Sequence, residues 1–131
     1  INLFNEKNNG SSILELIDKM LILSCHDISM GGILVNLAEM CIAGNLGANI
    51  NMPKSLINTN EYFFGEDQGR YLIEIEEIKY ENVAKILNKN SVFFDQIGKT
   101  QKEKLTLEKD FEISINEIKE YNNRWFKKYM S

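Results

Sequence analysis

Residues 21–41 have the sequence LILSCHDISMGGILVNLAEMC, which contains the strongest signals for the fold class. It opens with the apolar run Leu21–Cys25, which predicts a strand buried on both faces. A polar, glycine-containing loop follows at residues 26–32. Apolar residues then recur at helical spacing over residues 31–43, and Gly44 is placed to end that helix. A buried strand, a glycine turn and a helix in this order are typical of an α/β protein.

The predicted helix has one apolar face, made of Ile33, Leu34, Leu37, Ala38 and Cys41. Asn36 and Glu39 lie off this face. The two cysteines, Cys25 and Cys41, fall within apolar runs, where free thiols behave as small hydrophobic side chains. The sequence therefore predicts neither a disulfide nor a cysteine metal site.

Further elements are expected on both sides of this stretch. Two capping boxes, Ser12 with Glu15 and Ser114 with Glu117, predict a short helix at residues 12–19 and a helix that runs to the chain end. Other predicted elements are a surface excursion at 58–60, a helix at 81–88, and strands at 47–51 (ended by Pro53), 70–76, 91–97, 104–108 and 111–113. The fold class is α/β (α+β), a layered mixed sheet with helices packed on it, with the strand order left open.

Length and composition set the domain count. With 131 residues and 44% hydrophobic content, the chain matches one globular domain with a single core. Residues 1–11 are polar and lack a sustained period, so they are predicted to be a lead-in or linker, and residues 12–131 the domain. The first residue is Ile1, which suggests a piece of a longer chain.

Charge and hydropathy exclude two classes of partner. The formal net charge is -4, and lysines and acids are interspersed, so no basic stripe is available for nucleic acid. No apolar run approaches the ~20 residues that span a bilayer, and no secretory signal is evident, so a cytoplasmic location is expected.

The loop at residues 26–32 is the first candidate site. Gly31 and Gly32 would let the backbone approach a ligand, and Ser29 could cap the helix, whose free N–H groups attract phosphate. Asp27, at the strand's carboxyl end, could hold a Mg²⁺ that bridges phosphate oxygens. The alternative is an ordinary N-cap and a tight turn, which spacing alone favours.

A second candidate site lies at residues 63–70, before a predicted strand. Glu66, Asp67 and Gln68 offer acceptors and an amide for a polar substrate, and Arg70 could clamp a phosphate or a carboxylate. The alternative is a solvated loop with an arginine ion pair.

Several strings, in the same order, resemble the phosphoribosylformylglycinamidine synthase family. Residues 26–32 are similar to its pattern His-Asp-x-Ser-Asp-Gly-Gly, and Leu-Ala-Glu-Met and Ala-Gly-Asn-x-Gly follow at 37–40 and 43–47. Phe-Gly-Glu-Asp-Gln-x-Arg matches residues 64–70, and the closing Trp-(Leu/Phe)-x-x-Tyr-Met matches residues 125–130. The resemblance runs from about residue 13 to residue 130.

The resemblance implies an aminoimidazole ribonucleotide synthetase-like C-terminal domain, the last of four pieces of the small-form synthase subunit. The parent ligase uses ATP and Mg²⁺ to convert formylglycinamide ribonucleotide and glutamine-derived ammonia to the amidine in purine biosynthesis. Implied partners are the remaining domains of the parent, a glutaminase subunit and a small bridging subunit. The family's catalytic histidine lies in another subdomain, so no catalytic residue is expected here, His26 included, and the fragment alone should be inactive.

By analogy with the first half of the family's chain, the second-half copy would carry an auxiliary nucleotide or phosphate site. Its residues would be Asp27, Ser29, Gly31, Gly32, Glu66, Asp67, Gln68 and Arg70, with Asp27 as the metal ligand. Met30 stands where the family usually has Asp, which removes a metal or ribose contact, so the auxiliary site is expected to be weakened or empty in this protein.

Other readings stay open at this point. The chain is alternatively a non-catalytic interaction module that docks the glutaminase complex. A different relative, such as selenophosphate synthetase or thiamine monophosphate kinase, would lack the strings at 37–40 and 64–68. The run Leu21–Cys25 also suggests an exposed sheet edge that could pair two chains.

Overall fold

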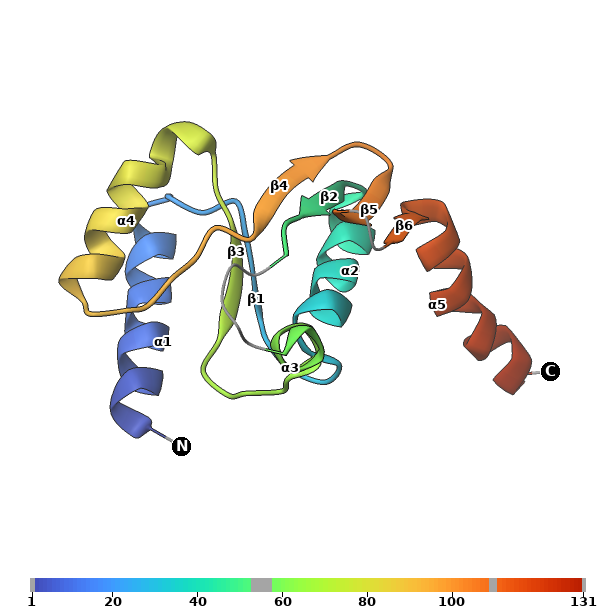
Figure 1. Ribbon diagram of the computed structural model, residues 1–131, viewed down its shortest axis with the longest axis horizontal. Coiled ribbons are helices and arrows are strands. Elements are labelled where there is room, and N and C mark those ends of the chain that lie inside the picture. Colours follow the sequence, from blue (N-terminus) through green and yellow to red (C-terminus); the bar gives the residue numbers. More distant parts are fainter. Residues whose placement is uncertain (1, 53–57, 109–110, 131) are drawn as a thin grey trace. The chain divides into compact units, whose positions relative to one another are not determined.

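The computed structural model describes residues 2–52, 58–108 and 111–130 (Figure 1). The chain divides into two compact units, residues 1–36 with 63–95 and residues 37–62 with 96–131. Chain length predicts one core, whereas the strands form two separate sheets and each unit buries apolar side chains of its own. In the described residues, no helix combines the length and the apolar character needed to cross a membrane.

The first unit combines a two-stranded sheet with helices. β1 (Ser24–Asp27) pairs antiparallel with β3 (Tyr71–Glu74). α1 (Leu3–Asp18) lies beside α4 (Tyr80–Lys89), and the short helix η1 (Glu77–Lys79) leads into α4 (Figure 1). Helix α4 agrees with the prediction for residues 81–88, because its apolar side chains recur strictly at helical spacing.

The core of the first unit is made where α1 and α4 meet. Leu16, Val83 and Leu87 are buried there, and Leu16 is 0% exposed. Partly buried side chains pack against them from the sheet and the loops: Leu21, Ile22, Ile73, Ile75, Ile86, Val92 and Phe94.

Helix α1 begins well before the predicted start at Ser12, so the expectation that secondary structure starts only after the polar lead-in was wrong. The cap is Asn2, whose side chain accepts hydrogen bonds from the N–H groups of Phe4 and Asn5. Ser12 is fully buried within the helix and accepts a hydrogen bond from Asn90 at 3.0 Å. The polar first half of α1 shows no apolar period because its asparagines bond to other segments, as Asn9 does to the Gly69 carbonyl at 2.8 Å.

Strand β1 is displaced toward the glycine turn relative to the predicted strand at 21–25. Leu21 and Ile22 precede the strand and pack on the core of the first unit instead. Cys25 is exposed, contrary to the prediction, because β1 belongs to a sheet of only two strands and alternate side chains face solvent. In the described part of the chain β1 has no second partner strand.

The second unit contains a four-stranded mixed sheet in the order β4-β2-β5-β6, which confirms the predicted mixed sheet. β2 (Gly47–Ile50) runs antiparallel to β4 (Gly98–Gln101) and parallel to β5 (Lys104–Leu107), and β6 (Phe111–Ser114) is antiparallel to β5. Side chains buried in this unit include Ala48, Ile50, Leu105, Leu107 and Ile115.

The C-terminal helix α5 (Ile115–Met130) follows β6 and starts as predicted. The Ser114 hydroxyl accepts a hydrogen bond from the Glu117 N–H at 3.1 Å, which is the first half of the predicted capping box.

The strand predicted at residues 91–97 is absent from the described structure, and β4 follows that segment instead. Ser91 has a positive φ of 56°, which turns the chain after α4, and Val92 and Phe94 pack on the core from a loop. The apolar side chains that alternate in this segment therefore pack on the core from a loop, and the segment does not pair as a strand.

Two helix boundaries also differ from prediction. α2 spans Gly32–Gly44, and Asn45 instead of Gly44 takes the left-handed conformation that ends it, with φ 52°.

Residues 59–64, predicted in part as a surface excursion, form the short helix α3 (Thr59–Phe64), because the Asn58 side chain accepts a hydrogen bond from the Asn60 N–H at 3.0 Å. Pro53, the predicted end of the strand before it, lies outside the described residues.

Candidate functional site

The two candidate segments lie next to each other in the first unit and line one pocket. Its walls come from the turn after β1 (Asp27, Ile28, Ser29, Met30) and from the segment that enters β3 (Glu66, Gln68, Gly69, Arg70, Tyr71). The pairing of β1 with β3 explains this, since it sets Asp27 opposite Tyr71. The Ile28 N–H continues the pairing with a hydrogen bond to the Arg70 carbonyl at 2.8 Å.

The turn at the start of α2 requires glycine at two positions. Gly31 and Gly32 have φ values of 85° and 71°, a region that L-residues rarely adopt. A Cβ on Gly32 would lie 2.6 Å from the Phe63 carbonyl oxygen. The turn is therefore packed tightly against the backbone at the start of the second candidate segment.

Three backbone donors of this turn already have acceptors within the chain. The Ser29 N–H donates to Asn36 Oδ1 at 2.7 Å, and the Gly32 N–H donates to the Ser29 carbonyl at 3.1 Å. The Gly31 N–H donates to Glu66 Oε1 at 2.8 Å, and this bond links the two candidate segments. At the N-terminus of a helix, N–H groups that have no acceptor within the chain commonly bind phosphate.

Asn36 is a site residue that the sequence analysis missed. Its spacing predicts a position off the apolar face of α2, but the side chain is 1% exposed. Its amide nitrogen donates to Ser29 Oγ at 3.2 Å and lies 3.5 Å from the Met30 carbonyl. Asn36 therefore anchors the turn, and the Ser29 hydroxyl accepts its hydrogen bond from Asn36. A single asparagine in an otherwise apolar stretch of helix was the available signal.

Arg70 carries the positive charge of the pocket. Its Nη2 donates to the Gly65 carbonyl at 2.5 Å and lies 3.5 Å from Asp67 Oδ2. Its Nε is buried and has no hydrogen-bond partner among the described residues. Asp67, whose side chain is 76% exposed, neutralises part of the guanidinium charge from outside the pocket lining.

The donor set fits a phosphate-bridged cation better than a dedicated metal cage. In the described residues no group of three or more His, Cys, Asp or Glu side chains could hold a metal ion. Asp27, with a side chain 73% exposed, and Glu66 both line the pocket. Mg²⁺ usually binds through one or two carboxylates together with substrate phosphates and water, so these two side chains suit that mode.

The neighbouring titratable groups give no sign of a nucleophile. Partial desolvation, and next the Asp27 carboxylate, raise the pKa of the Cys25 thiol above its ordinary range. A thiol with a raised pKa stays protonated at neutral pH and is a poor nucleophile. His26 lies in β1, where its Nδ1 is 2.6 Å from the Asp27 carbonyl oxygen.

The chain belongs to the family described as AIR synthase related protein, C-terminal domain, whose model matches residues 2–110. It is 48% identical over 130 residues to the phosphoribosylformylglycinamidine synthase subunit PurL of Pelagibacter ubique (strain HTCC1062), covering 99% of this chain and 18% of the relative. The same subunit of Rhodopseudomonas palustris (strain BisB5) is 33% identical, with the same coverage. The chain thus spans 18% of the length of these curated relatives.

Solved structures share the fold. The crystal structure of phosphoribosylformylglycinamidine synthase II from Thermotoga maritima matches with a TM-score of 0.77 at 22% identity, over 90% of this chain and 22% of that chain. The T. maritima PurL complexed with ATP matches with a TM-score of 0.76, over 88% of this chain and 22% of that chain. The T. maritima PurLQS structure matches with a TM-score of 0.77, over 88% and 21%.

Proposed function

We propose that this chain is the C-terminal domain of a phosphoribosylformylglycinamidine synthase subunit. The parent would be the ATP-dependent ligase that makes formylglycinamidine ribonucleotide from formylglycinamide ribonucleotide and ammonia in purine biosynthesis. The family membership and the 48% identity over 99% of the chain support this proposal. The T. maritima PurL complexes with ATP and ADP support ATP as the parent's cosubstrate, and Mg²⁺ would accompany it.

Within the parent we assign this domain a supporting role, as part of the enzyme's scaffold with an auxiliary phosphate or nucleotide site. The observation that carries this proposal is the meeting of the two candidate segments at one pocket. Asp27 and Glu66 would share a Mg²⁺, and Arg70 would contact a phosphate oxygen. Gln68 would orient the ligand, while Gly31 and Gly32 keep the backbone close to it.

ADP with Mg²⁺ is expected to bind the 131-residue chain, and Arg70→Met to weaken that binding at least about tenfold, because a charge-assisted contact to phosphate is lost. Isothermal titration calorimetry measures both affinities. Arg124→Met is the matched control, because Arg124 lies on α5, over the Tyr121 ring at 5.0 Å, and outside the pocket lining. If Arg70→Met and the unmodified chain bind ADP with Mg²⁺ with equal affinity, the proposed auxiliary site is wrong.

The parent's partners follow from the same proposal. A glutaminase subunit and a small bridging subunit would deliver ammonia, and the PurLQS structure of T. maritima supports an assembly of that kind. A cytoplasmic location and pairing of two chains through the free edge of β1 remain predictions from the sequence.

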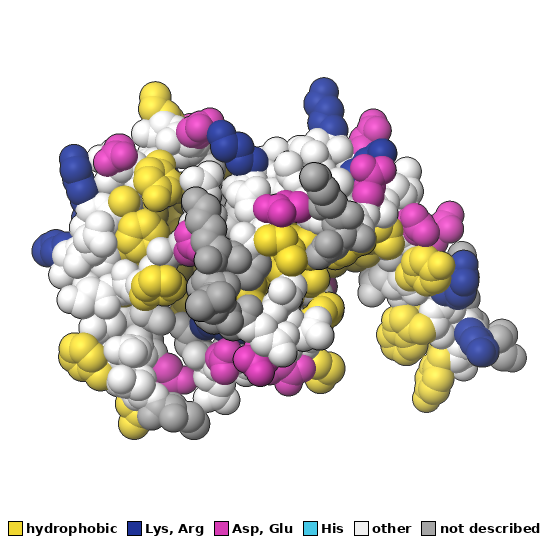
Figure 2. Space-filling model, in the orientation of Figure 1, with side chains coloured by type: hydrophobic (Ala, Val, Ile, Leu, Met, Phe, Trp, Pro, Cys, Tyr) yellow, Lys and Arg dark blue, Asp and Glu magenta, His cyan; other side chains and the backbone are white. Residues whose placement is uncertain are grey.

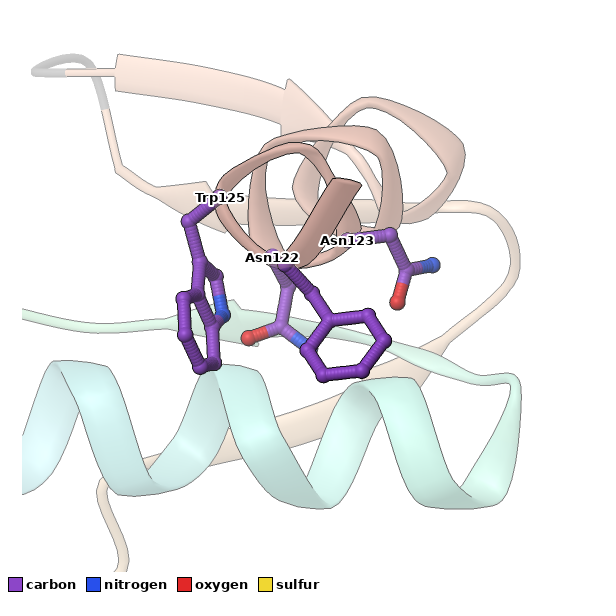
Figure 3. A pocket seen from close by; sticks show the side chains of 4 residues that line it. Asn122, Asn123 and Trp125 are labelled. Carbon is purple, nitrogen blue, oxygen red and sulfur yellow. The ribbon is translucent and has the colours of Figure 1, made fainter. Parts of the chain in front are cut away.

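A second candidate function, docking of the glutaminase complex, is favoured by the exposed aromatic face of α5. Tyr121, Trp125 and Tyr129 recur at intervals of four residues and are 58%, 62% and 80% exposed. Figure 2 shows hydrophobic side chains gathered along this helix, and Figure 3 shows Trp125 and Asn122 projecting from the same side of it. Trp125 also contacts Phe126 edge to face, with ring centroids 5.8 Å apart. Exposed aromatic clusters of this kind often anchor protein interfaces.

Trp125→Ala combined with Tyr129→Ala in the parent subunit is expected to weaken its association with the glutaminase and bridging subunits at least about tenfold, because two aromatic anchors are lost. Analytical ultracentrifugation of the mixed subunits measures the change. Glu120→Gln, an exposed residue of the same helix that lies outside the pocket lined by Trp125, serves as the control. Unchanged association, with a lower melting temperature of the parent subunit alone, would mean that α5 packs within the parent and does not dock the glutaminase.

A further inference from the structure

Glu66 occupies the place that an external anion would take at the start of α2. Its Oε1 accepts a hydrogen bond from the Gly31 N–H at 2.8 Å, next to the first residue of the helix. A carboxylate here is favoured by the partial positive charge of the helix N-terminus, just as a phosphate would be. The chain therefore supplies its own anion to the pocket.

We propose that Glu66 is an internal gate, which keeps free phosphate out of the pocket and must leave the Gly31 N–H before a phosphate group can bind there. This inference rests on the proposed auxiliary phosphate site and describes how that site is regulated. It adds that the ligand has to displace a side chain of the protein itself.

Of the three acceptors that hold this turn, Glu66 is the one that a ligand can displace. Asn36 is buried, and the Ser29 carbonyl is part of the main chain of the turn. Glu66 instead is exposed, and its side chain reaches Gly31 across 35 positions of sequence. Rotation of an exposed side chain breaks this bond without unfolding the turn.

The charges around the pocket also disfavour the binding of free phosphate. Among the described residues that line it, Asp27 and Glu66 are carboxylates and Arg70 is the one cation. The guanidinium is already engaged by the Gly65 carbonyl and by Asp67. A free phosphate would meet net negative charge, whereas a phosphate that arrives with a divalent cation brings its own compensation. The gate therefore favours metal-bound phosphate ligands over free phosphate.

The test is a titration of the 131-residue chain and its variants with inorganic phosphate in the absence of divalent cations, followed by the Gly31 amide resonance in NMR. Glu66→Gln keeps the size of the side chain and removes its charge, and we expect phosphate to bind about fivefold more tightly. Glu66→Ala frees the Gly31 N–H, so a gain of about tenfold or more is expected. Without ligand, the Gly31 amide resonance should already move in Glu66→Ala, because its acceptor is lost.

Glu6→Gln is the matched control. The Glu6 side chain lies against Gly69, which lines the same pocket, so this change removes a nearby carboxylate that does not hold Gly31. We expect Glu6→Gln to change the phosphate affinity less than about twofold. An equal gain in Glu6→Gln and Glu66→Gln would show a general effect of charge and would overturn the gate.

The remaining outcomes separate the gate from the auxiliary site. If ADP with Mg²⁺ binds but the Glu66 variants take up phosphate no better than the unmodified chain, the gate is wrong and the auxiliary site stands. If phosphate binds to the Glu66→Ala variant but ADP with Mg²⁺ binds to neither the chain nor its variants, the gate is supported and the proposed nucleotide site is wrong. If neither phosphate nor ADP with Mg²⁺ binds the chain or any of its variants, both are wrong.

Discussion

Gly32→Ala is expected to lower the free energy of unfolding by about 3 kcal/mol or more, with loss of the ordered turn at the pocket. The left-handed conformation at φ 71° costs an L-residue about 1–2 kcal/mol. The new Cβ would also lie 2.6 Å from the Phe63 carbonyl oxygen and 2.7 Å from the Phe64 Cα. Because these are backbone atoms, they cannot move aside as the end of a flexible side chain would, so the clash adds to the conformational cost.

Urea denaturation followed by circular dichroism measures this loss. Gly44→Ala is the matched control on the same helix, since a Cβ there would meet nothing within 4 Å. Replacing a helical glycine by alanine usually stabilises by about 0.5–1 kcal/mol. The explanation fails if the two alanine variants unfold at the same urea concentration.

Asn36→Ala is expected to cost about 2–3 kcal/mol of unfolding free energy. The asparagine is 1% exposed and bonds to both the N–H and the hydroxyl of Ser29. Its removal breaks two part-buried hydrogen bonds, at about 0.5–1.5 kcal/mol each, and also opens a small cavity. The turn should loosen, and binding of ADP with Mg²⁺ should weaken with it.

The stability loss is measured by the same denaturation experiment, and the loosening by faster amide hydrogen exchange at Ser29. Asn123→Ala, an exposed asparagine on α5, should change stability by less than about 0.5 kcal/mol. A similarly small change in Asn36→Ala would mean that Asn36 does not hold the turn.

Local signals in the sequence were enough for several elements of the fold. Residues only a few positions apart specify the glycine turn before α2, the amphipathic helix α4 and the Ser114 cap of α5. The structure contains all three features. Helical spacing and caps depend on neighbours within one or two turns, so they can be recognised in a single sequence. The strings shared with the synthase family were equally local, and the family match confirmed that resemblance.

Other features depended on contacts that no local pattern records. α1 begins at Leu3 because Asn2 caps it and its polar side chains bond to other segments, and no apolar period marks that. The segment 91–97 alternates like a strand but packs as a loop, since β2 pairs with β4 instead. Whether a segment forms a strand depends on which other segments lie beside it in the folded chain. The periodicity of a sequence carries no information about those neighbours.

Read alone, the sequence predicted several residues that line the candidate pocket, among them Asp27, Glu66 and Arg70, together with the glycine turn beside it and the family to which the chain belongs. The burial of Asn36 and the hydrogen bond from the Gly31 N–H to Glu66 arise only in the folded chain. The reason is that a turn is specified by the conformations open to a few adjacent residues, whereas a hydrogen bond across 35 positions exists only once β1 and β3 have paired and brought both segments together.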